Sequence, residues 1–540
     1  MSEKLGEILI KKGFLKEKSL EFCLELKKSF NSKKLGQYLR NYNFVNDSQI
    51  AQAIAQQVNW DFFTGEYIAD MEILEQLTID YCIEKLVFPL KSNGTISFVL
   101  ANNDDTETTD FLMERFKATV KFSIGIESVM IQALEYLKHD FNKIIENERL
   151  ILDSNEEQDI QAWVNAIVNK AIRQGASDIH FEPFTNEYLV RYRIDGKLTH
   201  RDTADLLIRN KTTNVIFNKS KINISEFHKL HDEQFDHKYL KQIFELRVSH
   251  LPTVHGSGLV LRVLDQNKSA QPLESLGYAP QNLQIIKDAL IKPNGITLIT
   301  GPTGCGKSTS LYSILNQLKS LEKKIISIED PVEVKIPLVT QVKIDQPRDI
   351  TFAKSIRAFL RHDPDIISIG EIRDEETARE AFRASETGHQ VFSTLHTNTT
   401  IDSLLRLKGL GVELSSLVNS LTCVIAQRLV RKLCPYCKQS VTISKKDAHK
   451  FELQYLVKDT QTVYRPKGCN KCFDGFLGRT VVAEVLYIDK TIKDLISNNK
   501  IERISDYLES QNSYLTIQKD AARLIEEGKT SIDEVIGILG

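Results

Sequence analysis

The stretch ITLITGPTGCGKSTSLYSILNQLKSL, residues 296–321, decides the fold. An apolar run with strand character leads into a glycine-rich loop, and a run with helical character follows. This order predicts a phosphate-binding P-loop, because glycines let backbone amides wrap a phosphate and the helix N-terminus adds partial positive charge. Lys307 is expected to reach the β- and γ-phosphates of a nucleotide, and the Ser308 hydroxyl to ligate Mg²⁺.

The cysteine inside this loop has two interpretations. Cys305 is either a thiol available for redox chemistry or, more simply, a small side chain tolerated between glycines. The residues predicted to bind nucleotide are Gly301, Pro302, Thr303, Gly304, Cys305, Gly306, Lys307, Ser308 and Thr309.

Two further apolar runs end in acidic side chains, in IISIEDPVEV (325–334) and IISIGEIRD (366–374). Parallel strands of an α/β sheet present their carboxyl ends to the nucleotide. We therefore expect Glu333 and Glu371 near the γ-phosphate, where water attack needs a positioned carboxylate and a charge-balancing metal. The alternative is that these acids cap helices or pair with Arg373.

Four more side chains at strand ends are candidates for contact with the γ-phosphate or with a neighbouring subunit: Glu329, Asp330, His389 and His396. The two histidines flank the apolar run of TGHQVFSTLHTN (387–398). A lone histidine is more often structural, but two that flank one strand of this sheet could sense the phosphate.

Length and pattern predict several domains, because 540 residues are too many for one core. From residue 281 onward, strand and helix patterns alternate, which indicates a parallel sheet with crossover helices. The predicted parts are an N-terminal domain at 1–150 (a helical repeat at 1–60 and an α/β part at 61–150), an acidic linker at 151–160, a second α/β domain at 161–278, and a P-loop domain at 279–540 that includes a zinc module at 430–480.

Charge and hydropathy restrict the class of protein. The net charge of −2 gives no overall field that attracts nucleic acid. No apolar run approaches the roughly 18 residues that a membrane helix needs. The start, MSEKLGEILIKK, carries charges where a signal peptide needs an unbroken apolar core. We expect a cytoplasmic protein with no transmembrane segment of its own, whose membrane role works through partners.

Four of the eight cysteines form two CxxC pairs, CPYC (434–437) and CNKC (469–472). In a reducing compartment such pairs point to metal rather than to disulfides. Four thiolates suit tetrahedral Zn²⁺ and leave no open position, so the site would be structural. Redox chemistry is the weaker alternative, since one thiol pair would suffice. The predicted zinc ligands are Cys434, Cys437, Cys469 and Cys472.

The surroundings of these cysteines are basic. From Arg428 to Arg479 there are twelve Lys or Arg against four Asp or Glu. A basic zinc ribbon could bind nucleic acid. The simplest alternative is a solvated surface.

Four stretches, in order, resemble the type II/type IV secretion ATPase superfamily: GPTGCGKSTSLY, IEDPVE, DPDIISIGEIRD and TGHQVFSTLHTN. They look like its Walker A motif, aspartate box, atypical Walker B motif and histidine box. The resemblance covers roughly residues 160–540. It implies a multidomain α/β fold: a RecA-like P-loop core with a parallel sheet, preceded by a PAS-like α/β domain and an N-terminal helical/α+β domain.

The resemblance also implies an activity, Mg²⁺-dependent ATP hydrolysis by a homohexamer. In this family the Walker B strand ends in Gly-Glu, which accounts for Gly370 before Glu371. Glu333 would activate the attacking water, and Glu371 would act on the metal side.

Arginines of the second domain are carried over as phosphate-facing candidates, because an arginine can neutralise transition-state charge from across a subunit boundary. Arg191 and Arg193 are the preferred pair, in VRYRIDG. Surface ion pairs are the alternative for any one of them. Arg247 and Arg262 complete the set.

The second domain departs from the family pattern in one segment. Family members usually carry an Arg-rich stretch with a Pro-Gln-Asp-Gly turn where this chain has EFHKLHDEQFDHKY (226–239). Ser257 also stands where a Glu is usual. The contacts that those residues make in relatives, including some at the subunit interface, are therefore in doubt here.

The first sixty residues repeat KLGEIL, from Lys4, as KLGQYL, from Lys34. The repeat resembles the MshE-type N-terminal domain that binds cyclic-di-GMP in many of these motors. Both family arginines are lysines here, a glycine is replaced at Asn43, and the terminal Gln is lost at Lys27 but kept at Gln57. Lysine lacks the guanidinium fork with which arginine grips phosphate or stacks on guanine. We therefore expect the fold of this domain, with cyclic-di-GMP binding left open. The alternative to ligand binding is a domain that docks on the membrane platform.

The resulting hypothesis is an ATP-hydrolysing motor that powers type IV pilus assembly (PilB-like) through an inner-membrane platform protein. The basic zinc module would dock on the cytoplasmic face of that platform, so the chain would be peripherally associated with the inner membrane. The alternative is a type II protein secretion ATPase (GspE-like). More distant alternatives are a nucleic-acid translocase with a RecA-like core and a nucleotide-regulated scaffold; nucleic acid is not the expected partner.

Overall fold

The computed structural model describes most of the chain, as two compact units, Met1–Ser154 and Asn155–Gly540. The boundary between the two units falls within the predicted linker, 151–160. The last residues of that predicted linker, from 157 onward, belong to a helix instead. Helix α9 already begins at Glu157, because acidic residues favour the first turn of a helix as much as they favour a linker. The described residues are 3–30, 34–65, 67–90, 95–101, 106–116, 120–131, 133–134, 137, 157–204, 208–239, 242–265, 271–444, 460–469, 472–511 and 514–539.

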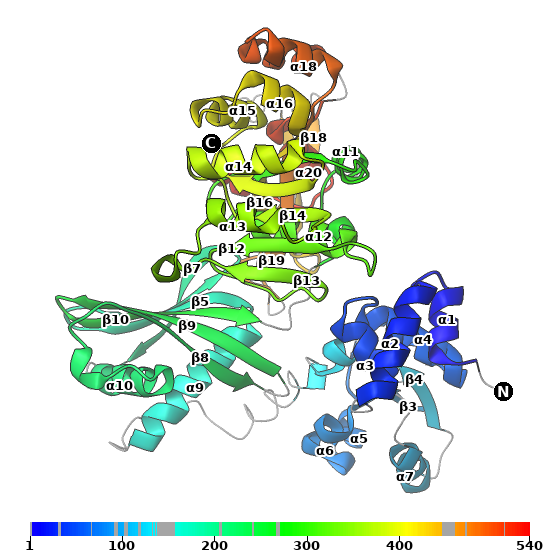
Figure 1. The fold of residues 1–540 in the computed structure, drawn as a ribbon. Coiled ribbons are helices and arrows are strands. Elements are labelled where there is room, and N and C mark those ends of the chain that lie inside the picture. The colour runs from blue at the N-terminus through cyan, green and yellow to red at the C-terminus, as the bar shows by residue number, and fades with distance from the viewer. Residues whose placement is uncertain are drawn as a thin grey trace. The chain divides into compact units, whose positions relative to one another are not determined.

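The first unit opens with the predicted repeat, and each copy consists of a helix, a short turn and a second helix (Figure 1). Both copies begin alike. Lys4 and Lys34 are extended, and their backbone N–H groups donate to the side chains of Glu7 (3.2 Å) and Gln37 (3.0 Å). The four helices are α1 (Leu5–Lys11), α2 (Glu17–Phe30), α3 (Leu35–Asn41) and α4 (Asp47–Val58).

The replacement of a repeat glycine by Asn43 keeps the turn. Asn43 has a left-handed φ of 51°, and Gly13 at the matching position of the first copy has 70°. Asparagine tolerates this conformation better than most residues. The departure therefore does not alter the backbone of the second copy.

A four-stranded sheet completes the first unit, in the order β1-β4-β3-β2. The predicted hairpin is confirmed, since β2 and β3 pair antiparallel from Val87↔Leu100 to Leu90↔Ser97. Of the helix expected at 129–141, residues 132, 135–136 and 138–141 lie outside the described residues. The elements are β1 (Asp61–Phe62), α5 (Met71–Leu77), α6 (Ile79–Lys85), β2 (Val87–Leu90), β3 (Ile96–Leu100), α7 (Thr106–Phe116) and β4 (Val120–Ile124).

The second unit begins with a six-stranded antiparallel sheet in the order β7-β6-β5-β10-β9-β8. Helices α9 and α10 lie against the same face of this sheet (Figure 1). The segment that departs from the family pattern forms η2 (Ile224–Glu226) and the edge strand β8. The other bounds are α9 (Glu157–Arg173), β5 (Ala176–Pro183), β6 (Tyr188–Ile194), β7 (Lys197–Ala204), α10 (Arg209–Ser220), β8 (His231–Tyr239), β9 (Gln242–Thr253) and β10 (Gly256–Asp265).

The remaining part of this unit is built on a seven-stranded sheet in the order β13-β12-β14-β15-β11-β16-β19. Every neighbouring pair is parallel except β16–β19, which confirms the predicted parallel sheet. The strands are β11 (Gly295–Thr300), β12 (Ile325–Glu329), β13 (Val339–Lys343), β14 (Ile366–Ile369), β15 (Gln390–Leu395), β16 (Leu421–Leu433) and β19 (Phe476–Tyr487).

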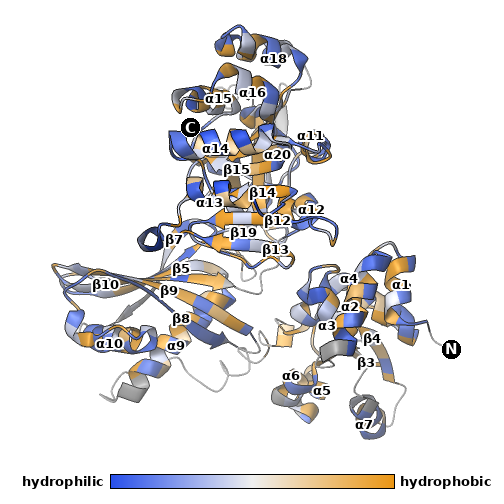
Figure 2. Cartoon of the chain, in the orientation of Figure 1, coloured by the Kyte–Doolittle hydropathy of each residue, from blue (hydrophilic) through white to orange (hydrophobic). Residues whose placement is uncertain are grey.

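Helices cover both faces of this sheet. Successive residues Leu298 and Ile299 of β11 belong to two different core clusters, one packed on each face. The inner strands are therefore buried along their whole length, and many of their residues are hydrophobic (Figure 2). The helices around the sheet are α11 (Pro280–Leu290), α12 (Lys307–Leu318), α13 (Phe352–Phe359), α14 (Glu375–Glu386), α15 (Thr400–Gly409) and α16 (Leu414–Ser420).

The C-terminal part packs on β16 and β19. A two-stranded hairpin lies between the two CxxC pairs, and residues 445–459 between its strands are outside the described residues. Among the described residues, no helix is long and apolar enough to cross a membrane. The elements are β17 (Gln439–Ser444), β18 (Thr460–Arg465), α18 (Lys490–Ser497), α19 (Ile504–Ser510), α20 (Ile517–Glu526) and α21 (Ile532–Leu539).

Gly370 follows β14 at a point where two strands come very close. Its N–H donates to the carbonyl oxygen of Ile328 in β12 at 2.8 Å. A Cβ atom at residue 370 would lie 3.2 Å from the same oxygen and 3.4 Å from the Cα of Glu329. Glycine therefore allows the strand to end against β12 and sets the place of Glu371.

We expect Gly370→Ala to destabilise the second unit by about 1–3 kcal/mol, because the added methyl group crowds backbone rather than a flexible side chain. Gly409→Ala is the matched control, since a Cβ there meets nothing within 4 Å. Differential scanning calorimetry checks this, and equal unfolding midpoints for both variants would contradict it.

Candidate nucleotide site and candidate metal centre

The loop between β11 and α12 has the backbone that a phosphate site needs. Gly304 and Gly306 have φ of 79° and 87°, a conformation that residues with a side chain rarely adopt. Lys307 opens α12, and its Nζ donates to the carbonyl oxygens of Gly301 (2.7 Å) and Pro302 (3.1 Å). The lysine thus lies over its own loop, with the N–H groups of the first helical turn beside it.

Cys305 is a packing residue in this loop. It is 4% exposed, and burial raises the pKa of its thiol. A Cβ at Gly301 would lie 2.5 Å from its Sγ. Redox chemistry needs an accessible thiol with a lowered pKa, so the structure favours the small-side-chain interpretation.

Glu371 stands at the carboxyl edge of the sheet with two basic partners. Arg373 donates to one of its carboxylate oxygens, and His396 Nε2 lies 3.3 Å from the other. His396 directly follows β15, the neighbour of β14. Burial lowers the pKa of Lys307, and the charge of Glu371 acts in the opposite direction. The structure therefore brings Glu371, His396 and Lys307 together.

Glu333 lies beside the start of the P-loop helix. Its carboxylate hydrogen-bonds with the Ser308 hydroxyl and interacts electrostatically with Arg262 and Arg247. The residue keeps a solvent-exposed surface, yet desolvation of its carboxylate by the surrounding protein raises its pKa. A glutamate with a raised pKa beside a potential Mg²⁺ ligand is suited to accept a proton.

The two arginines near Glu333 are Arg247 and Arg262, not the preferred pair of the sequence analysis. Arg247 Nη2 donates to the Val332 carbonyl oxygen at 3.3 Å, one residue before Glu333. Arg262 also pairs with Asp178 at 3.0 Å. Both come from the second domain of the same chain, so they meet the 330–334 segment without a neighbouring subunit.

Arg191 and Arg193, the preferred pair, make other contacts in this chain. Arg191 forms a two-point pair with Glu182 (2.5 and 2.7 Å), and Arg193 donates to the Gly196 carbonyl oxygen at 3.0 Å. Partners within the second domain thus occupy both guanidinium groups. Within one chain, Arg247 and Arg262 are the arginines that meet the Glu333 segment. The role of Arg191 and Arg193 across a subunit boundary stays a prediction.

Two of the four strand-end candidates do not face the phosphate loop. Glu329 is 4% exposed, and its carboxylate accepts hydrogen bonds from Tyr312, Ser327 and Gln341 inside the core. His389 precedes β15, so it lies at the amino edge of the sheet, where its carbonyl oxygen bonds the Gly295 N–H. His389 therefore lies at the edge opposite the P-loop of its own chain, and a contact with a neighbouring subunit stays a prediction.

Asp330 and His396 remain at the carboxyl edge. Asp330 Oδ2 is 4.0 Å from Arg373 Nη1, and half of the His396 side chain is exposed. Both can meet a ligand or a neighbouring subunit.

Arg428 is a basic residue at the loop that the motifs did not reveal. It lies on β16, and its guanidinium donates to Asn398 O (3.2 Å), Asn398 Oδ1 (3.1 Å) and Gln427 O (3.0 Å). A Cβ at Gly301 would lie 3.3 Å from its Nη1. These acceptors are uncharged, so its positive charge is available to a phosphate. The sequence signal was only an Arg on a strand without a recognised motif.

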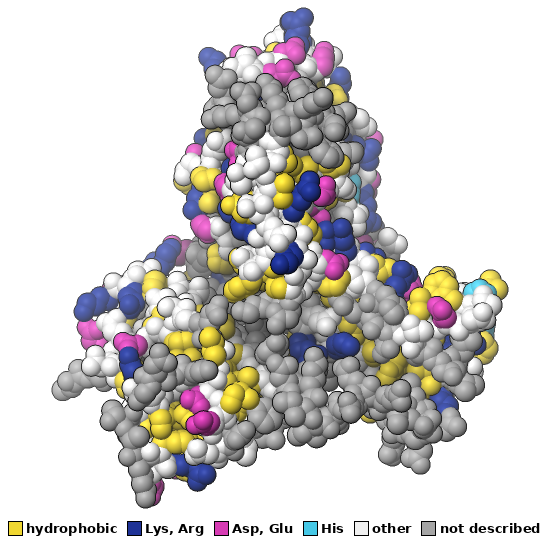
Figure 3. Space-filling model, turned by 180° about the vertical axis from the view of Figure 1, so that it is seen from behind, with side chains coloured by type: hydrophobic (Ala, Val, Ile, Leu, Met, Phe, Trp, Pro, Cys, Tyr) yellow, Lys and Arg dark blue, Asp and Glu magenta, His cyan; other side chains and the backbone are white. Residues whose placement is uncertain are grey.

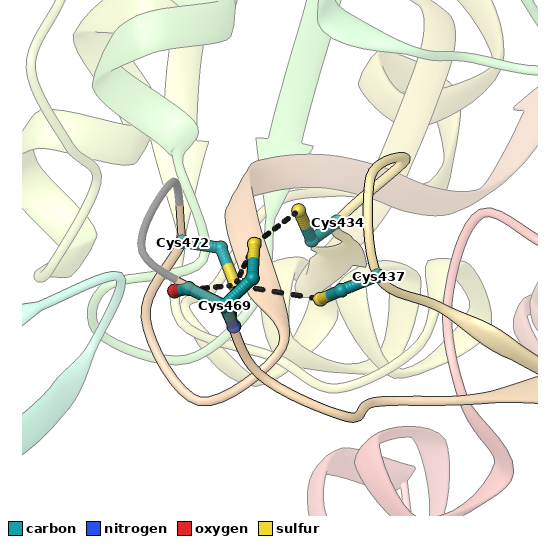
Figure 4. A group of neighbouring side chains, drawn as sticks. All are labelled: Cys434, Cys437, Cys469 and Cys472. Atoms are coloured by element: carbon teal, nitrogen blue, oxygen red, sulfur yellow. Dashed lines mark hydrogen bonds between the residues drawn. The ribbon is translucent and has the colours of Figure 1, made fainter.

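The four paired cysteines converge in space (Figure 4). Their sulfur atoms all lie within 4.8 Å of one another. Three separations are Cys434–Cys469 at 3.9 Å and Cys437–Cys472 and Cys469–Cys472 at 3.6 Å. A tetrahedral ion with Zn–S bonds of about 2.3 Å places its ligands roughly 3.8 Å apart. The cluster therefore fits a structural Zn²⁺ ion.

Comparisons with known proteins agree with this geometry. The family model described as Type II/IV secretion system protein matches residues 153–537. The type IV pilus assembly ATPase PilB of Acinetobacter baylyi is 33% identical over 561 residues, covering 98% of this chain and 95% of that protein. The type II secretion system protein E of Dickeya dadantii is 39% identical over 395 residues, covering 72% and 77%.

A solved structure shows the same fold. The ATPase DotB of Yersinia pseudotuberculosis covers 72% of this chain and 96% of its own, with a TM-score of 0.55 at 21% identity. At that identity the likeness supports the architecture of the second unit and nothing finer.

We expect Cys437→Ser to abolish zinc binding and to make the β17–β18 hairpin sensitive to protease, because metal binding of about 10–16 kcal/mol is coupled to folding of such modules. Atomic absorption should find one zinc per wild-type chain and none in the variant. Cys23→Ala, in the first unit, is the control. Full zinc occupancy in Cys437→Ser, or none in the wild type, would contradict the assignment.

Proposed function

The chain belongs to the type II/IV secretion system protein family and is an ATPase, and we propose that it is the motor that powers type IV pilus assembly. One observation carries the pilus assignment. The similarity to the pilus assembly ATPase extends over 98% of this chain, whereas the similarity to the secretion protein E of Dickeya dadantii covers 72%. The first unit, 1–154, thus has its counterpart in the pilus relative.

In the proposed mechanism, the P-loop binds the phosphates of ATP. Lys307 would turn from its two loop carbonyls to the β- and γ-phosphates, and the Ser308 hydroxyl would hold Mg²⁺, which neutralises developing phosphate charge. Arg428 adds a second cation beside Gly301.

Two carboxylates divide the remaining work. Glu333, beside Ser308, would accept the proton of the attacking water, and its raised pKa suits that task. Glu371, held between Arg373 and His396, would act on the metal side. Both stand at the carboxyl edge of the parallel sheet.

Arg247 and Arg262 give the nucleotide site a physical connection to the second domain. Both interact with the segment that carries Glu333. A change in charge at the γ-phosphate would therefore alter the contact between the two domains. We propose that a homohexamer passes this motion to an inner-membrane platform protein through the basic zinc module.

Type II protein secretion is the second candidate function, supported by 39% identity to a secretion protein E over 72% of this chain. A nucleic-acid translocase has less support. Basic and acidic side chains are interspersed over the upper part of the face in Figure 3, whereas nucleic-acid binding favours a basic stripe. Cyclic-di-GMP remains a candidate ligand of the first unit; absence of heat on titration into the full chain would remove it.

The catalytic assignment is tested by two variants of the purified protein. Lys307→Ala should lose phosphate release by at least about 100-fold, because the loop loses its cation. Glu333→Gln should bind ATP but hydrolyse it about 10²–10⁴-fold more slowly, because the base is lost. In the wild type, kcat should fall as the medium becomes acidic enough to protonate Glu333, at a pH above the usual glutamate pKa of about 4.3. Turnover by Glu333→Gln at the wild-type rate would remove its assigned role.

The choice between pilus assembly and secretion is tested in the parent bacterium. The chromosomal copy is replaced by Lys307→Ala, surface pili are counted by electron microscopy, and secreted proteins are quantified. We expect pili to be lost and secretion to be kept, with the wild-type gene supplied on a plasmid as control. Lost secretion with intact pili would favour the secretion motor, and loss of neither would contradict a motor role.

A further inference from the structure

Tyr312 connects the P-loop helix to the segment that carries Glu333. It lies on α12, the helix that Lys307 and Ser308 begin, and is 6% exposed. Its hydroxyl donates to Glu329 Oε2 at 2.6 Å and accepts the backbone N–H of Glu333 at 3.2 Å. One hydroxyl group thus joins the phosphate-binding helix, the end of β12 and the backbone of the proposed base.

The acid that receives this hydrogen bond is fixed by its other partners. Glu329 Oε1 accepts from Ser327 Oγ at 2.6 Å and from Gln341 Nε2 at 2.9 Å. With Tyr312 included, three donors meet one buried carboxylate. Such a fully satisfied buried network is rigid, and it is costly to leave any member of it unpaired.

Gln341 fixes the far end of the same segment. Its Nε2 also donates to the Val334 carbonyl oxygen at 3.0 Å, and its Oε1 accepts the Ile336 N–H at 2.7 Å. Residues 330–336 are therefore held from the middle by Tyr312 and from the end by Gln341. Glu333, between these points, has its backbone fixed while its carboxylate reaches Ser308.

The protonation of the Tyr312 phenol determines which of its two hydrogen bonds it donates and which it accepts. A phenol has one proton to donate and lone pairs to accept with. Burial raises the pKa of Tyr312, and the neighbouring Glu329 raises it further, so the phenol keeps its proton. The proton serves Glu329, and the oxygen is free to accept the Glu333 N–H.

We propose that Tyr312 is a positioning residue for ATP hydrolysis, whose hydroxyl sets the place of Glu333 relative to Ser308 and Lys307. Its side chain is almost fully buried and acts through Glu333 alone. The inference rests on the proposed role of Glu333, and its test keeps the two apart.

The test replaces one oxygen atom, in Tyr312→Phe of the full chain, and measures MgATP hydrolysis. We expect kcat to fall about 10- to 100-fold while KM for MgATP stays within about threefold, because the loop still binds phosphate but the base is misplaced. A kcat within threefold of wild type overturns the proposal.

Tyr507→Phe is the matched control. The Tyr507 hydroxyl also donates to a carboxylate, Asp489 Oδ2, at 3.0 Å. Asp489 follows the end of β19, whose Tyr487 pairs with Cys423 near the amino edge of the sheet, opposite the P-loop. This variant should lose the same kind of hydrogen bond and keep wild-type kcat. An equal loss of kcat in both variants would show a general effect on stability and overturn the proposal.

A double-mutant cycle with Glu333→Gln separates positioning from support of the fold. If Tyr312 acts through Glu333, the double variant should turn over as slowly as Glu333→Gln alone. Multiplied losses in the double variant would overturn the positioning role and leave the role of Glu333 intact. Wild-type kcat in Glu333→Gln would overturn both.

A second variant keeps the proposal testable if Tyr312→Phe does not fold. Gln341→Met has a similar volume but releases the Val334 and Ile336 ends of the segment. It should lower kcat several-fold with KM unchanged. An unchanged kcat would overturn the account in which fixing 330–336 positions Glu333.

Discussion

The parallel register of β11, β15, β14 and β12 is the constraint on which the rest of this structure depends. Thr300 pairs with Leu395, and Ile369 pairs with both Ser393 and Ile328. The residues that follow these strands therefore meet at one edge, where the P-loop, His396 and Glu371 lie. All four strands are buried on both faces, so a slip of one residue would bury the wrong side chains and is strongly disfavoured.

Close contact between the ends of β14 and β12 fixes the positions of the residues that follow these strands. Gly370 allows β14 to end against the Ile328 carbonyl, and Glu329 at the end of β12 is anchored by three donors. The catalytic candidates are thus placed by backbone contacts and buried hydrogen bonds rather than by flexible surface loops. Such placement is what proton transfer to a positioned carboxylate requires.

Strand β16 links the nucleotide site to the cysteine cluster. Gln427 is fully buried and donates to the Cys305 carbonyl at 2.9 Å, and the same strand ends one residue before Cys434. Between them, Arg431 is buried in a two-point pair with Glu534 of α21. Removing either partner would leave an unpaired buried charge, which is costly.

The second domain touches this region too. Asp195, in the turn between β6 and β7, accepts the Gly478 N–H at 3.0 Å. Arg247 at Val332 is a contact of the second domain near Glu333, whereas Asp195 contacts the P-loop domain nearer the cysteine cluster. In the proposed mechanism, contacts of these two kinds would transmit a change at the phosphates to the second domain.

The sequence predicted those features that depend on the spacing of nearby residues. The P-loop, the parallel strands, the helical repeat and the position of Glu371 at the carboxyl edge of the sheet were all predictable, because spacing and strand direction determine them. The contacts of Arg428 and Tyr312 were not, since the partners of each lie on other elements of the fold. Glu329 resembled a site acid in sequence, and only its burial shows that it supports the core. The preference for Arg191 and Arg193 over the other two arginines could not be checked from sequence, because it depends on how two domains pack.

A structure of the full chain with Mg²⁺ and a non-hydrolysable ATP analogue tests the central claim most directly. The account predicts Mg²⁺ about 2.0–2.1 Å from the Ser308 hydroxyl, with the Glu333 carboxylate within hydrogen-bond reach of a water in line with the γ-phosphate and the Tyr312 hydroxyl still on the Glu333 N–H. A structure in which Glu333 faces away from the γ-phosphate and another carboxylate holds that water would contradict it.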